Sequence, residues 1–353
     1  MSSPTKETIL AHTIPAPEAS RVLEEKMSLT WETKRLISEI EKEVAELDWG
    51  ITDPIQAVPG ISAPALHLLA AGGKRVRPLL VALLGRALGV PFATLAPCAV
   101  AAELVHTATL LHDDILDGAT TRRGRITAHL KYSAHTAILS GDSLLAKAIV
   151  DMAATNDPEI LKRLAQTVRE LVEGECLQAD LMGKVHGDIS TVLEIARRKT
   201  ASLFAWCGWV AGHRAGQMAD DLFKFGNHLG LAFQLLDDVI DWEGKDSGKT
   251  QFQDLHETKL NALGVALIRS SKHAAALLEG SFSQRDQHGM IPHPEDLGQK
   301  LKSCDEYPQA LAWVREEARR HSAFALANLE LLPDSEWKSL IKNLTIQLLE
   351  RMK

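Results

Sequence analysis

The residues whose types and spacing most clearly imply chemistry are two clusters of aspartates, each with the spacing DDxxD. On a helix, positions i and i+4 lie one above the other with i+1 beside them, so each cluster gathers three carboxylates. Hard oxygen ligands in this number favour Mg²⁺, which usually completes its shell with water and substrate phosphate. The first cluster is Asp113, Asp114 and Asp117 in LLHDDILDG, and the second is Asp237, Asp238 and Asp241 in QLLDDVIDW.

A solvated acidic helix end is the alternative interpretation of either cluster alone, since charge runs often occur on surfaces. Three carboxylates at a helix C-terminus also oppose the helix dipole, which makes them locally unfavourable without a cation. Each cluster follows a leucine pair, Leu110-Leu111 or Leu235-Leu236, which predicts a position at the rim of an apolar interior. The repetition of this pattern favours two metal sites that bind a diphosphate.

Basic residues near the first cluster support an anion site. In GGKRVRP (residues 72–78) a glycine pair lets backbone N–H groups approach an anion, and three cations precede a helix that begins near Pro78. Arg122 and Arg123 follow the first cluster, and the planar guanidinium group suits phosphate. Either basic patch alone would be an ordinary solvated surface.

Long helices are expected to position these residues. Of 14 prolines, only Pro158 lies between Cys98 and Ile291, and strand-like alternation with tight turns is lacking. We therefore predict an all-α fold, a single large bundle of mostly antiparallel helices. Apolar periodicity and helix-breaking residues predict helices at about 31–48, 62–70, 77–88, 93–117, 134–154, 158–181, 189–213, 218–242, 254–279, 295–303, 308–331 and 334–351.

Length and composition set the remaining expectations. With 353 residues, 45% of them hydrophobic, and a net charge of −7, the chain can bury a large core and lacks a nucleic-acid footprint. Four dispersed cysteines indicate reduced thiols in the cytosol. The apolar run 93–111 contains Pro97, Glu103 and His106, so it predicts a buried helix and no transmembrane segment. Residues 1–28 are expected to form a flexible polar arm and residues 29–353 a single domain.

Six motifs occur in an order that resembles the trans-type polyprenyl diphosphate synthases, the head-to-tail prenyltransferases. They span roughly residues 70–260 and are GGKRVRP, ELVHTATLLHDDILDGATTRRG, GDSLLAKA, GECLQ, RRKTASLF and GLAFQLLDDVID. The resemblance implies helices around a deep apolar tunnel, usually in a homodimer, and about three Mg²⁺ ions per active site. It implies a transferase that joins isopentenyl diphosphate to an allylic prenyl diphosphate.

The resemblance also implies roles for individual residues. Asp113, Asp117 and Asp237 would bind Mg²⁺ directly, and Asp114, Asp238 and Asp241 would complete the acidic shell. The allylic diphosphate would contact Arg122, Lys199, Thr200, Gln234, Lys249 and Lys259. Isopentenyl diphosphate would contact Lys74, Arg77, His106 and Arg123. Lys199, Thr200 and Gln234 would also stabilise the carbocation formed when the allylic diphosphate leaves, with the departing diphosphate as proton acceptor.

Product length is expected to depend on the helix upstream of Asp113. Short-chain members of the family tend to place an aromatic residue where this chain has Ala108 and Thr109. The next positions along the same helix are Leu104 and Ala101. Each turn rises about 5.4 Å, roughly one isoprene unit, so small residues here predict a product of C20 or longer.

The segment after the second cluster departs from the family pattern. Gly248-Lys249 comes early, Phe252 replaces a glycine, and DLHETKLNAL has Thr258, Asn261 and Leu263 for the usual Gly, Thr and Pro. A substrate-covering loop of altered shape is therefore expected. Two alternatives stay open: a non-catalytic regulatory subunit of a heteromeric synthase, and an HD-type metal phosphohydrolase suggested by the pair His112-Asp113.

Overall fold

The computed structural model describes residues 31–51, 60–244, 251–286 and 289–350, with the side chains of 31–34 and 348–350 excepted. The predicted arm at residues 1–28 and Lys249 lie outside this range. The chain divides into two compact units. Unit 1 comprises Met1–Val76 and Leu104–Ala146, and unit 2 comprises Arg77–Glu103 and Lys147–Lys353.

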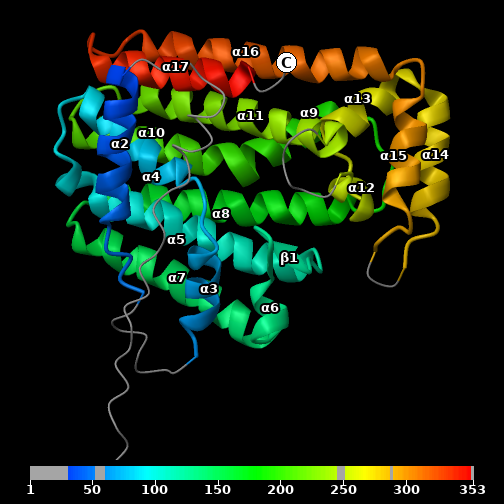
Figure 1. Cartoon of the computed structure of the whole chain (residues 1–353), viewed down its shortest axis with the longest axis horizontal. Helices are drawn as coiled ribbons and strands as arrows, with labels where there is room; N and C mark the ends of the chain where they lie inside the picture. Colours follow the sequence, from blue (N-terminus) through cyan, green and yellow to red (C-terminus); the bar gives the residue numbers. More distant parts are fainter. Residues whose placement is uncertain (1–30, 52–59, 245–250, 287–288, 351–353) are drawn as a thin grey trace, which may run out of the picture. The chain divides into compact units, whose positions relative to one another are not determined.

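The described chain is helical almost throughout, which confirms the predicted fold class (Figure 1). Three helices contribute residues to both units, namely α4 (Val76–Ala87), α5 (Phe92–Leu116) and α7 (Ala134–Ala154). Unit 1 also contains α2 (Trp31–Ala45), α3 (Ala63–Ala70) and α6 (Ala128–Lys131). Unit 2 also contains α8 (Pro158–Leu181), α9 (Ile189–Ala196), the π-helix η2 (Arg197–Ala201), α10 (Ser202–Arg214), α11 (Ala219–Glu243), α12 (Gln253–His256), α13 (Ala262–Ser270), α14 (Lys272–Phe282), α15 (Pro294–Lys302), α16 (Tyr307–Leu329) and α17 (Glu336–Glu350).

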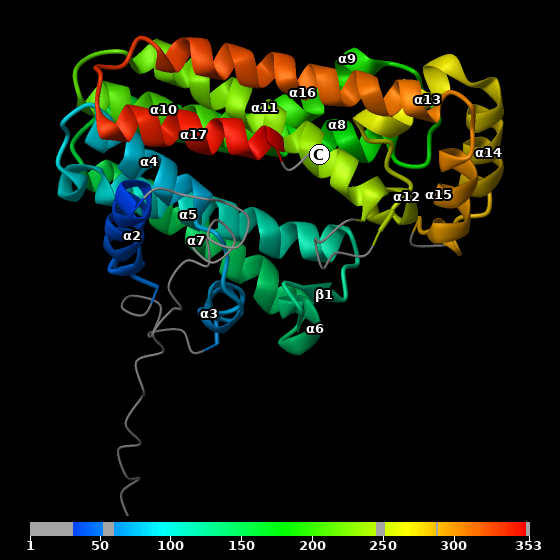
Figure 2. The ribbon, with the colours of Figure 1, turned by 45° about the horizontal axis from the view of Figure 1, so that its top comes forward.

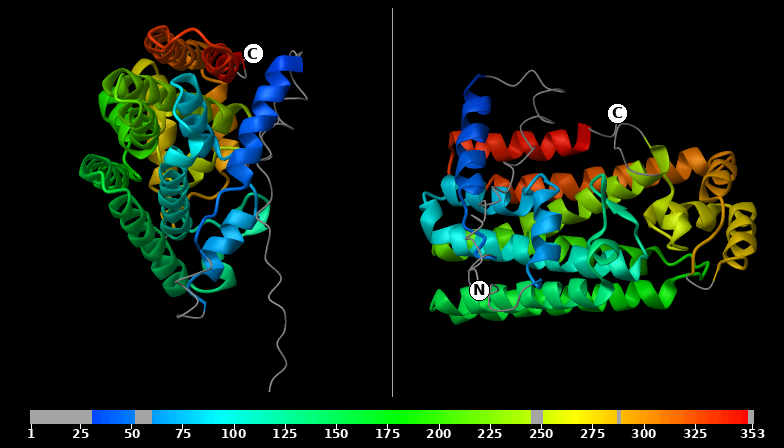
Figure 3. Two further views of the ribbon diagram at one scale, coloured as in Figure 1. Left: turned by 90° about the vertical axis from the view of Figure 1, so that its left-hand side faces the viewer. Right: turned by 60° about the horizontal axis from the view of Figure 1, so that its bottom comes forward.

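In unit 2, α11 is the central helix and packs against both α10 and α16. Glycines permit the close approach to α10: a Cβ on Gly208 would lie 2.0 Å from the Leu222 carbonyl oxygen, and one on Gly226 would lie 2.2 Å from that of Phe204. On the other side, α16 runs along α11, and α17 lies beside α16 (Figure 2). The left view of Figure 3 shows α16 and α17 nearly end-on. These glycines thus allow the backbones of α10 and α11 to pack in direct contact.

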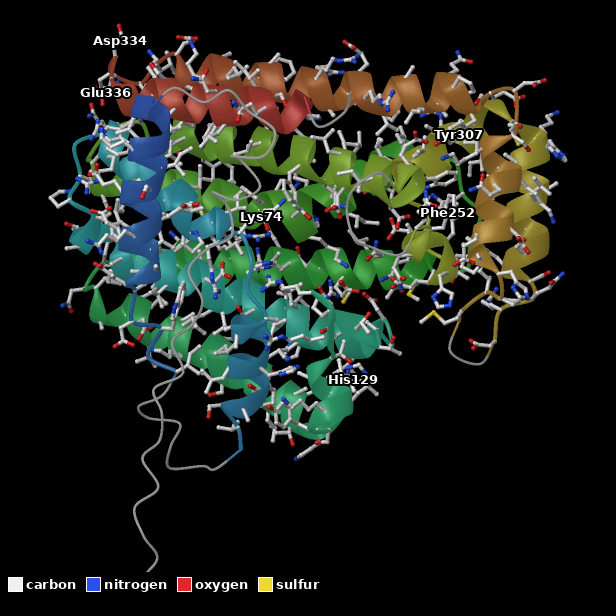
Figure 4. All side chains as sticks on the ribbon, in the orientation of Figure 1. Lys74, His129, Phe252, Tyr307, Asp334 and Glu336 are labelled. Carbon is white, nitrogen blue, oxygen red and sulfur yellow. The ribbon has the colours of Figure 1, made fainter. Side chains whose placement is uncertain are left out.

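The shorter helices α12 to α15 form one end of unit 2 (Figure 1). An aromatic cluster joins them to the end of α11: the Trp242 ring stacks on Tyr307 at 5.9 Å and meets Phe252 edge-on at 5.8 Å. Figure 4 shows Phe252 and Tyr307 at this end of the unit. Tyr307 donates a hydrogen bond to Glu243 at 2.7 Å, so the last turn of α11 is anchored from α16.

Unit 1 contains a short antiparallel hairpin that the sequence did not predict. Strands β1 (Thr121–Arg122) and β2 (Arg125–Ile126) flank a two-residue turn. Both turn residues have positive φ, 52° at Arg123 and 70° at Gly124, which is the geometry favoured in tight hairpins. With only two residues a strand, the hairpin lacks the alternation by which strands are recognised.

Two predicted helices are interrupted. The range 189–213 contains the π-helix η2 between α9 and α10, and 254–279 is three separate helices, so a single helix there was wrong. Asn261 and Ser271 start the second and third of these helices, each accepting a hydrogen bond from a backbone N–H three residues later. Such N-cap bonds were readable from the sequence as helix starts.

Helix α5 is the one described helix that is long and apolar enough to cross a membrane by length and composition alone. In its most apolar window, 67% of the residues are buried inside the protein. A mostly buried helix of this kind is typical of the core of a folded protein, in agreement with the burial expected for 93–111.

Candidate active site

The first acidic cluster closes α5 in unit 1, and its three aspartates differ in their surroundings. Asp114 is 1% exposed, whereas Asp113 and Asp117 are partly exposed. Arg122 on β1 donates from Nε at 2.7 Å and from Nη2 at 2.6 Å to Oδ1 of Asp114. Burial raises the pKa of Asp114, and Arg122 opposes this rise. The hairpin therefore ties the middle carboxylate to the protein.

The segment GGKRVRP is divided between the two units. In unit 1, Arg123 donates a hydrogen bond to the Gly72 carbonyl oxygen, and a Cβ on Gly73 would lie 2.8 Å from the Arg123 guanidinium. Only glycine leaves room for that guanidinium. The structure thereby brings Arg123 to the predicted anion-binding segment, and Lys74, the next residue, is exposed.

The other cations of this segment have different surroundings. Arg75 is 3% exposed, donates to the Leu69 carbonyl at 3.1 Å and lies 4.9 Å from the Trp49 ring, so it stabilises unit 1. Arg77 belongs to unit 2, where its guanidinium lies 4.9 Å from the ring of Phe204 on α10. His106 on α5 is half-buried.

The second acidic cluster lies in the last two turns of α11, and its middle aspartate is also the buried one. Asp238 is 4% exposed. Its Oδ1 accepts from Gln234 at 2.9 Å and its Oδ2 from the Ala262 N–H at 3.0 Å. Ala262 is the first residue of α13, so this carboxylate also binds a helix N-terminus. Burial, together with the nearby Asp254, raises the pKa of Asp238 to about 7.

Asp237 and Asp241 occupy the i and i+4 positions of the same helix and are partly buried. Asp241 accepts a hydrogen bond from the Gln253 N–H at 2.8 Å through Oδ1. Its Oδ2 is buried and has no hydrogen-bond partner among the described residues. Burial and then Asp254 raise the pKa of Asp241 to about 9. A buried carboxylate oxygen of this kind is the donor that a cation would satisfy.

Lys199, Thr200 and Gln234 come together in unit 2, as the resemblance implied. Thr200 donates to Gln234 Oε1 at 2.6 Å, and Gln234 in turn donates to Asp238. Lys199 Nζ donates to Gln178 Oε1 at 2.6 Å and pairs with Glu175. The motifs GECLQ, RRKTASLF and GLAFQLLDDVID thus meet through their side chains.

The segment from Phe252 to Leu263 has left-handed backbone at two of the positions where its sequence departs from the family pattern. Phe252 and Thr258, which stand where the family pattern has glycine, have φ of 59° and 52°, in the left-handed region that glycine favours. Asn261 replaces a threonine and serves equally as an N-cap, accepting from the Gly264 N–H at 3.1 Å. The local conformation at Phe252 and Thr258 is thus one that would suit the glycines of the family pattern.

Lys259 differs from the expected role. It is 6% exposed and pairs with Glu257, itself 5% exposed, at 2.8 Å. A buried lysine paired in this way is unlike a solvent-facing phosphate ligand, because separating the pair leaves a buried charge uncompensated. The interpretation of Lys259 as a diphosphate ligand is therefore weakened by its surroundings.

Several polar residues of this region were not predicted as site residues. Asp254 accepts from Asn261 Nδ2 at 2.8 Å and raises the pKa of both Asp238 and Asp241. Glu175 and Gln178 hold Lys199, and Glu257 holds Lys259. Glu175 and Gln178 lie inside GECLQ, and Asp254 opens DLHETKLNAL, so the motifs themselves were the available signal.

The residues present fit a hard divalent cation that takes substrate oxygens as further ligands. Within the described ranges, no three histidine, cysteine, aspartate or glutamate side chains already form a metal-binding group. Each cluster instead offers a pair of partly exposed aspartates, and the second includes the buried oxygen of Asp241. Mg²⁺ is usually bound by one or two carboxylates and takes substrate phosphate and water as its other ligands, which matches this arrangement.

The residues expected to control product length lie on α5. Ala101, Leu104 and Ala108 are fully buried, and Thr109 is partly buried. Thr109 donates to the His106 carbonyl at 2.9 Å, so its hydroxyl is satisfied by its own helix. From Ala101 to Thr109, about two and a half turns of α5, the side chains at these positions are therefore no larger than leucine.

The all-helical fold and the paired aspartate clusters define a protein of the isoprenoid synthase class. Residues 58–291 match the family model described as polyprenyl synthetase, and the chain belongs to this family. It is a prenyltransferase enzyme, a polyprenyl diphosphate synthase, which confirms the resemblance found in the sequence.

Individual relatives agree. The chain is 31% identical over 280 residues to the octaprenyl diphosphate synthase of Escherichia coli, covering 77% of this chain and 84% of that protein. The crystal structure of a decaprenyl diphosphate synthase from Rhodobacter capsulatus is similar with a TM-score of 0.78 and 29% identity, covering 91% of this chain and 99% of that one. A polyprenyl synthase from Caulobacter crescentus, complexed with calcium and isoprenyl diphosphate, gives a TM-score of 0.79 and 32% identity, covering 91% and 98%.

Proposed function

We propose that this enzyme condenses isopentenyl diphosphate with an allylic prenyl diphosphate and releases a trans-polyprenyl diphosphate of C20 or longer. One observation carries the proposal: both aspartate clusters divide their carboxylates in the same way. In each, the middle aspartate is buried and bonded to the protein, while the pair at i and i+4 stays partly exposed. That pair is the part of each cluster that can bind a cation and a diphosphate.

The proposed ligands of Mg²⁺ are Asp113 and Asp117 in unit 1, and Asp237 and Asp241 in unit 2. A divalent cation held there supplies positive charge that stabilises the negative charge on a departing diphosphate. Asp238 acts instead as a support, because Gln234 and the Ala262 N–H bind both of its oxygens. Asp114 is proposed as a support through Oδ1, which Arg122 binds, while its buried Oδ2 has no hydrogen-bond partner among the described residues. About three ions per active site are part of this proposal.

Two of the proposed diphosphate ligands are paired with a carboxylate in this structure. Arg122 is bonded to Asp114, and Lys199 pairs with Glu175. A diphosphate carries more negative charge than one carboxylate, so it can draw part of each cation's interaction to itself. Lys74, Arg77, His106 and Arg123 are the proposed contacts of isopentenyl diphosphate.

The proposed reaction begins when the allylic C–O bond breaks and its electron pair leaves with the diphosphate. Thr200 and Gln234 direct oxygen dipoles at the allylic carbocation that results. The double bond of isopentenyl diphosphate then supplies the electrons of the new C–C bond. The released diphosphate then accepts a proton from the carbon next to the new bond. The electrons of that C–H bond form the new double bond. The product is one five-carbon unit longer than the starter.

A product of C20 or longer follows from the small side chains at Ala101, Ala108 and Thr109, which leave room for a growing chain. The names of the octaprenyl and decaprenyl relatives support a medium or long product.

We also propose a homodimer in the cytosol. Large apolar side chains stay exposed on two helices of unit 2: Val150 is 65% exposed and Ile149 44%, both on α7, and Val172 on α8 is 57% exposed. Apolar residues that a single chain leaves in water are the ones that a second copy buries.

The test is turnover by the pure chain. Incubation with Mg²⁺, isopentenyl diphosphate and allylic starters of increasing length, followed by mass spectrometry, is expected to give prenyl diphosphates of C20 or longer. A regulatory subunit would give no product until mixed with a partner, and an HD-type phosphohydrolase would release phosphate from nucleotides without any chain elongation.

A further inference from the structure

A network of five charged residues links the π-helix η2, which carries Lys199 and Thr200, to the neighbouring helices. Two consecutive arginines of η2 bind three glutamates from two other helices. Arg197 binds Glu194 on α9 through Nε at 2.7 Å and Nη2 at 2.8 Å, and Glu170 on α8 through Nη1 at 2.8 Å. Arg198 binds Glu194 through Nε at 2.6 Å and also pairs with Glu173 on α8. Glu194 is shared by both arginines.

The next two residues of η2 make a different set of contacts. Lys199 reaches Gln178 and Glu175 on α8, and Thr200 reaches Gln234 on α11. Every side chain from Arg197 to Thr200 is therefore bonded to a residue outside η2. Ser202 adds a bond from its hydroxyl to the Arg198 carbonyl at 2.6 Å.

Two glycines hold η2 closely between α8 and α11. A Cβ on Gly174 would lie 2.8 Å from Cβ of Arg198 and 2.9 Å from Cγ of Lys199. A Cβ on Gly230 would lie 2.5 Å from Cα of Ala201. The π-helix has no space to move toward either neighbour, so its position depends on the groups that bind it along its length.

A π-helical turn is rare and poorly populated without support, and such turns occur frequently at functional sites. Glu194 provides that support, because a carboxylate bound in a fork by arginine has a fixed direction as well as a charge. The same contacts lower the pKa of Glu194 to about 2, so it stays charged at neutral pH.

We propose that Glu194, Arg197 and Arg198 are positioning residues, which hold the π-turn so that Lys199 and Thr200 meet the allylic diphosphate. The inference rests on the proposed function of Lys199 and Thr200. Glu170 and Glu173 extend the support to α8, which also carries Glu175 and Gln178. An ordinary surface network is the competing account, since these side chains are between 24% and 45% exposed and isolated exposed pairs contribute little.

Steady-state kinetics of four variants tests the proposal: Glu194→Gln, Thr200→Val, their combination, and Arg169→Gln as control. Arg169 lies on α8 and its Nε approaches Glu173 at 3.5 Å, so Arg169→Gln removes a charge from the same surface without changing a residue that pairs with Arg197, Lys199 or Thr200. For Glu194→Gln we expect kcat to fall at least about tenfold, because small errors in placing a reacting group cost up to a hundredfold. The KM for isopentenyl diphosphate and the melting temperature should change little, and the control should match the wild type.

The combination separates positioning from general stability. If Glu194 acts through Thr200, the double variant should be no slower than Thr200→Val alone, since residues acting as a unit are not additive. Wild-type kcat in Glu194→Gln, or additive losses in the double variant, would overturn the proposal. A Thr200→Val enzyme with full activity would instead refute the proposed function of that residue.

A second variant covers the case in which Glu194→Gln does not fold. Arg197→Lys keeps the charge but loses the fork to Glu194. We expect it to lower kcat with the same unchanged KM for isopentenyl diphosphate, and full activity in this variant would contradict the positioning role.

Discussion

At the scale of single residues, the two DDxxD clusters show that equal spacing does not mean equal roles. The spacing correctly placed the first and last aspartate together on one helix face. It could not show that the middle residue points into the protein, because that depends on Arg122 in a hairpin and on the N-terminus of α13. Asp114 and Asp238, which the sequence grouped with the metal ligands, are proposed here as supports.

Ala108→Phe is expected to shorten the product, because a bulky ring on α5 would block a chain growing past that turn. Ala108 is fully buried, so overpacking should also lower stability, by about 1–3 kcal/mol. Product length is measured by mass spectrometry at a temperature where the variant stays folded. Products of unchanged length would refute a role for this position.

At the scale of elements, two residues that stand where the family pattern has glycine adopt left-handed backbone conformations. Phe252 and Thr258 accept left-handed φ, and Asn261 caps α13. The side chains compensate: Phe252 packs under Trp242, and Thr258 donates to the Gly289 carbonyl at 3.0 Å. A sequence pattern records residue types, whereas the conformation also depends on such distant partners.

Asn261→Ala is expected to destabilise the protein by about 1–2 kcal/mol, since the Gly264 N–H loses its cap and Asp254 loses a donor. Asn261→Thr, which restores a capping hydroxyl, should recover much of the loss. Chemical denaturation of both variants measures the difference. Equal stability of the alanine and threonine variants would contradict the capping role.

A histidine pair between α11 and α16 predicts how stability depends on pH. The Nδ1 atoms of His228 and His321 lie 2.9 Å apart, with Arg320 and the ring of Phe324 beside them. Burial, then His228 and Arg320, lower the pKa of His321 to about 4. Burial and Arg320 also lower the pKa of His228.

Because the folded chain then binds fewer protons than the unfolded chain, stability is fully present above pH 6.5 and is lost as the pH falls toward 4. His321→Gln should reduce this loss by about 1 kcal/mol, a value discounted for the partial exposure of the ring. Melting temperatures across this pH range test the effect. An unchanged pH profile would show that the pair does not control it.

At the scale of the whole molecule, the sequence predicted the all-helical class and most helix boundaries because apolar periodicity and prolines report helices directly. It missed the hairpin of two-residue strands and the π-helix within 189–213, which depend on distant contacts. It also missed the breaks within 254–279, although Asn261 and Ser271 are residue types that cap helices. Among the site residues, Thr200 and Gln234 are bonded to each other beside Lys199, whereas Lys259 is buried against Glu257, a residue of DLHETKLNAL that the sequence had not singled out.

The proposed homodimer predicts that a charge on its apolar surface disrupts assembly. Val150→Asp should produce monomers, because a carboxylate buried in an apolar interface without a partner is strongly unfavourable. Analytical ultracentrifugation measures the mass, and Val172→Thr serves as a mild comparison on α8. A dimer that persists in Val150→Asp would place the interface elsewhere.

The central claim is that the partly exposed aspartates of both clusters bind the metal and the diphosphate, while the middle aspartates support the fold. Its most direct measurement is Mg²⁺-dependent chain elongation by Asp113→Asn, Asp237→Asn and Asp238→Asn. We expect the first two to lose activity by about a hundredfold or more at nearly normal melting temperatures. Asp238→Asn should mainly lower the melting temperature, because the Ala262 N–H loses a carboxylate acceptor. Elongation that survives in Asp113→Asn and Asp237→Asn would contradict the account.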